Sequence, residues 1–282
     1  MLDGRPLIDV HLHPARKSSL KMDWATWVQN FDSPEIQDVY RDDGTVDAVR
    51  FDLLLAAQGV DAAVVLAEYS PRVTGLQTAE DMAALAGPRV HFAASLNPHL
   101  HHPVEDELAR QLDLGAVALK VHPVHGGFPV NHRALYPAYA MLQERGLPLV
   151  VHCGTSTFPG ALNQYGDPVL IDDLLRDFRR LSIVLAHGGR GWWYDAAAFL
   201  ALANEHVWIE LSGLPPSRLQ TYYARHSWPR LTRKMIFGTD WPGIPGIAIN
   251  ARAVAALCTD DETAELVLAG NAQRVYGLIP AE

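Results

Sequence analysis

The chain has 282 residues, of which 49% are hydrophobic and 20% charged, and its net charge is -9. This composition is typical of a globular domain with a large core. The negative charge disfavours nucleic acid and anionic membranes as partners, because both require a basic surface, and it favours a small-molecule substrate.

Short apolar runs alternate with amphipathic stretches along the chain. The runs predict strands at 7–13, 62–67, 90–96, 116–122, 149–152, 183–187, 207–211 and 235–238. Helices are predicted at 46–58, 132–145 and 168–180, the last after Asp167 as its N-cap. Repeated βα units of this number predict an α/β fold, a (β/α)8 TIM barrel formed by residues 1–282 as a single domain.

The segment between the first strand and the first helix of the barrel is an insertion. It carries Trp24, Trp27, Phe31 and Tyr40. On the active-site face these aromatic side chains could form a lid or a pocket wall. They could equally pack on the rim of the barrel, and the sequence leaves both readings open.

The first predicted strand ends in a His-x-His pair, His11 and His13. Strand side chains alternate between faces, so Asp9, His11 and His13 are expected on one face, and 8, 10 and 12 on the other. At about 3.3 Å per residue the two imidazoles lie roughly 6.6 Å apart along the strand. Both can reach one metal ion.

Other predicted strands also end on chemically capable residues. His152 ends the fifth, His187 ends the sixth, and Asp240 follows the eighth. The carboxyl ends of barrel strands converge on one face, where active sites form. Burying such groups without partners costs several kcal/mol, so we predict that these residues surround a metal ion together with the His-x-His pair.

These residues belong to motifs that resemble the amidohydrolase superfamily, in particular the branch of aminocarboxymuconate-semialdehyde decarboxylase. The similarity extends over nearly the whole chain, through segments 8–13, 119–123, 151–154, 186–189, 211–215, 237–242 and 270–278. It implies a metal-dependent TIM-barrel enzyme. Related pyrone-dicarboxylate lactonases keep a similar residue set and work without metal, so the ligand set alone does not prove occupancy.

The resemblance implies roles for individual residues. The implied ligands of one divalent ion, zinc first and manganese second, are His11, His13, His152 and Asp240. Asp240 would also accept the proton of the attacking water. His187 would polarise or protonate substrate, or orient the water; a fifth ligand or a group that orients a ligand is the alternative.

Three residues near the strand ends are candidates for substrate binding. Arg16 and Arg190 could clamp a substrate carboxylate, although each alone could be a solvated surface charge. Trp193 could supply a flat wall for an unsaturated substrate or pack a helix on the barrel.

Weaker expectations concern other polar residues. Lys120 is expected to be a structural ammonium paired with Asp9 or Glu68 rather than a modified bridge between two metals. Asp9 is expected to orient a ligand imidazole. Six histidines lack a partner at a suitable position and are expected in loops or on the surface: His101, His102, His125, His132, His206 and His226.

Three functions are compatible with this sequence. The favoured one is hydrolysis of a small amide, ester or lactone, with a metal-activated water as nucleophile. The second is nonoxidative decarboxylation of an unsaturated or aromatic acid, for which an arginine pointing into the cavity would be the sign. The third is a noncatalytic binding barrel, which the full ligand set argues against.

Cysteine usage and targeting signals agree with a cytoplasmic enzyme. Cys153 and Cys258 show no Cys-x-x-Cys spacing, so neither a disulfide framework nor a zinc-thiolate site is indicated. We expect no signal peptide, because the first strand begins close to Met1, and no membrane span. A homo-oligomer remains open.

Overall fold

The computed structural model describes residues 1–30 and 33–278, without the side chains of Trp24 and Trp27. Its centre is a parallel sheet of eight strands in the order β1-β2-β5-β6-β7-β8-β9-β10. These strands are β1 Ile8–Leu12, β2 Ala62–Leu66, β5 Val90–Ser95, β6 Ala118–Val121, β7 Leu149–Gly154, β8 Ile183–Arg190, β9 Val207–Glu210 and β10 Met235–Ile236. All eight predicted strands are present.

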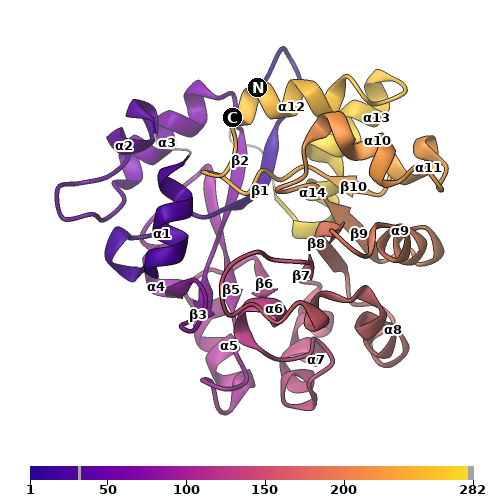
Figure 1. Cartoon of the computed structure of the whole chain (residues 1–282), viewed down its shortest axis with the longest axis horizontal. Helices are drawn as coiled ribbons and strands as arrows, with labels where there is room; N and C mark the ends of the chain where they lie inside the picture. The colour runs from indigo at the N-terminus through magenta and orange to yellow at the C-terminus, as the bar shows by residue number, and fades with distance from the viewer. Residues whose placement is uncertain (31–32, 279–282) are drawn as a thin grey trace.

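The sheet closes on itself between its first and last strands. The Val10 amide donates to the Phe237 carbonyl at 3.3 Å, and the Asp240 amide donates to the His11 carbonyl at 2.9 Å. Helices surround the strands (Figure 1), as a (β/α)8 barrel requires. The predicted TIM-barrel fold is therefore confirmed.

The helices follow the strands in chain order. They are α1 Met22–Gln29, α2 Pro34–Asp38, α3 Ala48–Ala57, α4 Ala79–Ala83, α5 Val104–Asp113, α6 Pro123–Gly126, α7 Tyr136–Arg145, α8 Asp172–Asp177, α9 Tyr194–Ala203, α10 Leu219–Tyr222, α11 Trp228–Thr232, α12 Ile247–Ala255, α13 Asp261–Glu265 and α14 Asn271–Tyr276. None in the described part of the chain has the length and apolar character needed to cross a membrane.

The predicted helices are found with small changes at their starts. Helix α3 occupies most of 46–58, and its N-cap is Asp47, whose carboxylate accepts the amide protons of Val49 and Arg50. Short 3-10 turns precede both α7 and α8 within the other two predicted helices. Asp167 caps the turn before α8 by accepting from the Val169 amide, as its position in the sequence predicts.

The apolar core has two layers. The inner one collects side chains from every barrel strand, and residues of α14, including Ala272 and Tyr276, pack against them. The outer one lies between strands and helices and includes Leu12, Phe51 and Leu55. Burial on both sides explains why the strands are continuous apolar runs.

Strand β1 departs from the strict alternation that its sequence predicts. Ile8 and Val10 belong to the inner layer, whereas Leu12 belongs to the outer one. The pairing of β1 with β2 shifts register between Asp9 and Leu12, and such an irregularity re-aims the side chains beyond it. The prediction that 8, 10 and 12 share a face was therefore wrong, although His11 and His13 still point to one place.

A hairpin interrupts the simple βα order after β2. Its strands β3 Glu68–Ser70 and β4 Gly75–Gln77 pair antiparallel. The insertion after β1 contains α1 and α2, and its Tyr40 is buried in the outer core layer, so this aromatic packs on the rim as one reading expected. Phe31 lies outside the described residues, as do the side chains of Trp24 and Trp27.

Asp9 ties β1 to the segment after β10. Its carboxylate accepts the His11 amide at 3.1 Å, the Thr239 amide at 3.1 Å and the Thr239 hydroxyl at 2.6 Å. These groups differ from the ligand imidazole that the sequence led us to expect, and that expectation was wrong. The Asp9 carboxylate binds mainly backbone amides, because the side chain is directed toward the place where the first and last strands of the barrel meet.

Replacing Asp9 by alanine is expected to destabilise the barrel. The Asp9→Ala variant leaves two buried amides and one hydroxyl without their acceptor, so the free energy of unfolding should fall by about 3 kcal/mol. Urea denaturation measures this value. Asp3→Ala, which removes an exposed partner of Arg252, is the control and should cost less than about 1 kcal/mol; equal costs for both variants would contradict the role assigned to Asp9.

Candidate metal and catalytic site

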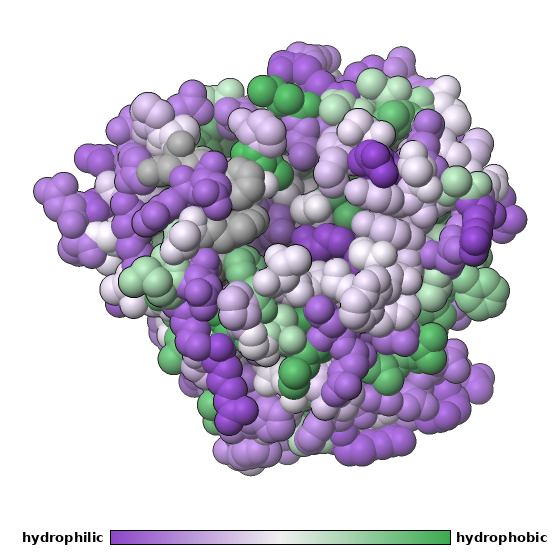
Figure 2. All heavy atoms as spheres, in the orientation of Figure 1, coloured by the Kyte–Doolittle hydropathy of each residue, from purple (hydrophilic) through white to green (hydrophobic). Residues whose placement is uncertain are grey.

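A polar cavity of about 360 Å³ opens at the carboxyl ends of the strands. The face seen in Figure 2 is hollowed near its centre, where hydrophilic atoms are visible. Residues from both ends of the sequence line the cavity, among them His11, His13, Glu68, Lys120, His122, His125, His152, Ser156, His187, Arg190 and Asp240. Six of the predicted site residues therefore share one cavity.

Three of these side chains offer ligand atoms to a single point. His11, His13 and Asp240 each supply one atom, and all three atoms lie within 4.8 Å of one another. The Nε2 atoms of His11 and His13 are 3.2 Å apart, and Asp240 Oδ1 is 3.4 Å and 3.5 Å from them. Tetrahedral zinc with bonds near 2.05 Å separates its ligand atoms by roughly 3.3 Å, so this spacing fits an ion.

Backbone geometry at two strand ends aims side chains into the cavity. His187 has φ +66° and Asp240 has φ +70°, in the left-handed region that side-chain-bearing residues rarely adopt. Such strain of about 1 to 3 kcal/mol is found mostly at functional sites. Asp240 reaches His11 and His13 from this conformation.

His152 stands next to this group without belonging to the tight set. Its ring centre is 4.5 Å from that of His187, and its Nε2 is buried without a hydrogen-bond partner among the described residues. A buried ring nitrogen without a partner is costly. A metal ion would satisfy it, so His152 remains the candidate for a fourth ligand.

Burial keeps these imidazoles neutral. It lowers the pKa of His13, and it lowers those of His11 and His152 well below the usual value. Neighbouring positive charges, such as Lys120 beside His11, act in the same direction. Neutral imidazole is the form that binds metal, so the site is ready for a cation at neutral pH.

His11 is oriented by Glu210, which the sequence analysis did not single out. Its Nδ1 lies 2.8 Å from Glu210 Oε2, and the hydroxyl and amide of Ser212 also donate to this carboxylate. Burial raises the pKa of Glu210 to about 8, against the pull of Lys120. A Cβ on Gly238 would collide with Glu210 Oε1, which explains the glycine there.

A Glu210→Gln substitution should weaken metal binding by about 10- to 100-fold, as changes to groups behind metal ligands usually do. The amide retains the size of the side chain, but one of its two acceptor oxygens becomes an NH2 group, so it can no longer accept from both His11 Nδ1–H and the Ser212 amide. Titration against a chromophoric chelator measures the affinity. Glu262→Gln, at a side chain that is 72% exposed, should leave it unchanged, and an unchanged affinity in both variants would refute the orienting role.

Lys120 is fully buried beside the ligands. Its Nζ is 3.4 Å from His11 Nε2, and among the described residues it forms no ion pair with Asp9 or Glu68, so the predicted pairing was wrong. Burial lowers the pKa of Lys120 to about 8. A lysine with a lowered pKa can lose its proton, and the neutral amine does not repel a nearby cation.

Ser212 holds the Nδ1 side of the His187 ring. Its Nδ1 is 3.0 Å from the Ser212 carbonyl oxygen and 2.9 Å from the Ser212 hydroxyl. A carbonyl only accepts, so Nδ1 carries the proton and Nε2 presents its lone pair. Burial lowers the pKa of His187 well below its usual range, so the ring is neutral and its Nε2 can accept a hydrogen bond or bind an ion.

The three candidate substrate residues lie in different places. Arg190 lines the cavity, where its Nη1 is 3.8 Å from Asp240 Oδ2 and its Nε donates to the Thr155 carbonyl at 3.3 Å. Arg16 is half exposed and paired with Asp81. Neither Arg16 nor Trp193 lines the cavity; the Trp193 ring packs against Trp192, 5.3 Å between centres.

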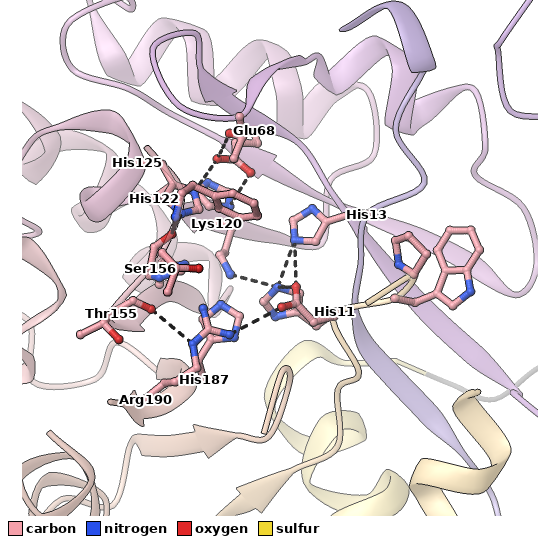
Figure 3. Close-up of a pocket in the computed structure, with 17 residues that line it drawn as sticks. His11, His13, Glu68, Lys120, His122, His125, Thr155, Ser156, His187 and Arg190 are labelled. Carbon is pink, nitrogen blue, oxygen red and sulfur yellow. Dashed lines mark hydrogen bonds and ion pairs between the residues drawn. The ribbon is translucent and has the colours of Figure 1, made fainter. Parts of the chain in front are cut away.

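A second group of side chains faces the ligands across the cavity (Figure 3). His125 Nδ1 is 2.9 Å from Glu68 Oε1, and its Nε2 is 3.0 Å from Ser156 Oγ. His122 Nε2 is 3.4 Å from Glu68 Oε2. The prediction of a loop or surface position was therefore wrong for His125, which is only 8% exposed.

The position of Glu68 could have signalled this group. It follows the apolar run of β2 directly, and a carboxylate next to a buried strand requires partners. Burial alone would raise the pKa of Glu68, but the imidazoles of His122 and His125 lower it well below its usual range. Glu68 is thus an ionised acceptor inside the cavity.

The family profile that describes amidohydrolases matches residues 8–278. The chain therefore belongs to the amidohydrolase family, a family of generally metal-dependent enzymes. This confirms the resemblance drawn from the strand-end motifs. No curated protein sequence is similar enough to count as a match.

Solved structures share the fold over almost their whole length. An uncharacterised TIM-barrel protein from Bordetella bronchiseptica is 23% identical, with a TM-score of 0.75 over 96% of this chain and 98% of that one. A 5-carboxyvanillate decarboxylase from Sphingomonas paucimobilis is 15% identical, with a TM-score of 0.65 over 98% and 100%. A probable 2-pyrone-4,6-dicarboxylic acid hydrolase from Acinetobacter baumannii is 16% identical, with a TM-score of 0.64 over 96% and 99%. Identities this low establish the common fold alone.

Proposed function

We propose that this amidohydrolase is a metal-dependent hydrolase of a small ester, lactone or amide that carries a carboxylate. The observation that supports it most is the cavity shared by His11, His13, Asp240 and Arg190. It combines ligands for one divalent ion, zinc or manganese, with a guanidinium that faces the same space. Such a combination suits a substrate in which the reacting carbonyl lies close to a carboxylate.

The residues divide the work of such a hydrolysis. A divalent ion held by His11, His13, Asp240 and His152 would lower the pKa of a water and polarise a carbonyl. Asp240 accepts the proton of the attacking water, because an ionised carboxylate has lone pairs to spare. His187 Nε2 orients that water or accepts a proton, and the Arg190 fork holds the substrate carboxylate.

The positions of the two arginines favour an acidic substrate over a neutral one. Arg190 faces the cavity, whereas Arg16 pairs with Asp81 outside it. Lys120 adds a second basic group to the cavity wall. The carboxylates of Glu68 and Asp240 line the same cavity, so the feature that would bind an anion is the guanidinium fork of Arg190 rather than a net positive charge.

A carboxy-lyase is the alternative that the same observation favours. Arg190 would grip the carboxylate that leaves as carbon dioxide, and an acid would protonate the carbon. Structures that share the fold bear the names of a decarboxylase and of a hydrolase of a dicarboxylic acid. A noncatalytic barrel is disfavoured, because the buried His152 Nε2 would remain unsatisfied without an ion.

The experiment compares lactones and aryl esters that carry a carboxylate with their neutral methyl esters or amides. We expect ring opening or ester cleavage, faster for the acids, with loss of activity on chelation and recovery with zinc or manganese. Release of carbon dioxide without hydrolysis would favour the carboxy-lyase. Rates that are equal before and after complete removal of metal would contradict the proposal.

A further inference from the structure

Three side chains on the cavity wall opposite the metal ligands form a hydrogen-bonded chain. Ser156 Oγ lies 3.0 Å from His125 Nε2, and His125 Nδ1 lies 2.9 Å from Glu68 Oε1. The residues come from the loop after β7, from α6 and from β3. All are at least nine-tenths buried and line the cavity.

The chemistry of the three groups fixes the direction of the protons. Glu68 is ionised and can only accept, so His125 Nδ1 carries the proton that it donates. His125 Nε2 of this tautomer has a free lone pair, and Ser156 therefore donates its hydroxyl proton to it. The two hydrogen bonds therefore run in the same direction as in a serine nucleophile with its general base and the carboxylate that orients the base.

Further contacts hold both ends of this chain in place. The Thr74 hydroxyl donates to Glu68 Oε1, and His122 Nε2 lies 3.4 Å from Oε2. The Ser156 amide donates to Asn163 Oδ1 at 2.8 Å, and its Oγ accepts the Phe158 amide at 3.3 Å. One lone pair of Ser156 Oγ remains for attack.

A purely structural role explains these contacts less well. A buried hydrogen-bonded network stabilises a fold wherever it lies, but this one ends in a hydroxyl on the wall of the cavity that holds the metal ligands (Figure 3). Any substrate in the cavity would meet that hydroxyl. The adjacent Thr157 also lines the cavity, but among the described residues its hydroxyl forms no hydrogen bond to an imidazole, whereas Ser156 has His125 as a base beside it.

We propose that Ser156 is a nucleophile for acyl transfer from small activated esters or lactones, with His125 as general base and Glu68 as the residue that positions it. The Ser156 Oγ–carbonyl carbon bond forms while its proton passes to His125 Nε2. The bond from the carbonyl carbon to the leaving oxygen breaks, and that oxygen takes the proton from His125. Water, with His125 again as the base, then attacks the acyl-serine ester. This step releases the acid and restores the Ser156 hydroxyl. This activity needs no metal and so goes beyond the proposed function.

The test is covalent labelling of the full chain, as purified and after chelation. A fluorophosphonate bonds its phosphorus to Ser156 Oγ and releases fluoride, with the serine proton taken up by His125 and then solvent. We expect one adduct per chain, located at Ser156 by peptide mass spectrometry, with or without metal. 4-Nitrophenyl acetate should give a burst of nitrophenolate close to one equivalent.

Variants separate the members of the relay. Ser156→Ala should give no adduct and His125→Gln should label about 100-fold more slowly, as expected for loss of a general base. Thr157→Ala, the matched control, should still form the Ser156 adduct. For Glu68, a far-downfield proton resonance of His125 Nδ1 should be present in the wild type and absent in Glu68→Gln.

Failure of the wild-type chain to label, labelling at another residue, or equal rates in wild type and His125→Gln would overturn the inference. None of these results touches the metal-dependent function, which is measured separately as chelator-sensitive hydrolysis. Conversely, labelling that persists in a chain without any chelator-sensitive activity would leave the serine assignment standing and remove the metal proposal.

Discussion

Replacing Asp240 by asparagine is expected to lower kcat/KM for hydrolysis by about 1,000-fold, within the range of general-base contributions. The amide keeps the size of the side chain, but it has no charge to hold a cation and cannot take a proton from water. Asp240 Oδ1 lies 3.4 Å and 3.5 Å from the two ligand imidazoles, which suits a metal ligand, and the second oxygen of the carboxylate can take the proton. Steady-state kinetics under saturating zinc or manganese measure the effect.

The matched control for this variant is Asp261→Asn. Asp261 pairs with Arg5 on the surface, where its side chain is 85% exposed, and its loss should leave kcat/KM unchanged. Circular dichroism of both variants checks that the barrel is intact. A loss of less than about tenfold for Asp240→Asn would show that this carboxylate is not the proton acceptor.

Replacing His13 by alanine is expected to reduce bound metal from about one ion per chain to less than a tenth of that at equal metal concentration. Its Nε2 lies 3.2 Å from that of His11, and three protein ligands are the usual minimum for a catalytic zinc site. Hydrolysis should fall with metal content. Inductively coupled plasma mass spectrometry after gel filtration measures the ion.

His206→Ala is the control for metal loss, because His206 lies in the turn before β9, away from the cavity lining. It should bind as much metal as the wild type. Equal metal content in His13→Ala and His206→Ala would mean that the ion, if bound, lies elsewhere.

The strand-end pattern carried most of what the sequence could predict. The apolar runs are long enough to identify all eight barrel strands, and the barrel itself brings distant strand ends together. For that reason His152, His187 and Asp240 could be predicted to meet the His-x-His pair in one cavity. The last residue of a run, or a residue shortly after it, marked each of these positions, and barrel geometry brings the positions together.

The parts that could not be predicted depend on local irregularities and partner choice. The register shift in β1 lies beyond Asp9 and re-aims Leu12, whereas Asp9 binds Thr239 in the segment after β10; strict alternation along one strand anticipates neither. Glu210, rather than Asp9, orients His11. The position of Glu210 inside the apolar run of β9 was a signal, because a buried carboxylate requires partners. His125 gave no signal of its own, since only the β3–β4 hairpin brings Glu68 to it.

The central claim is that one divalent ion joins residues from β1, β7 and the segment after β10. The most direct measurement is a crystal structure of the chain with zinc or manganese, with the ion located by anomalous scattering. We predict one peak at about 2 Å from nitrogen atoms of His11, His13 and His152 and from Asp240 Oδ1. The absence of a peak, or a peak more than about 4 Å from His152 or Asp240, would contradict the account.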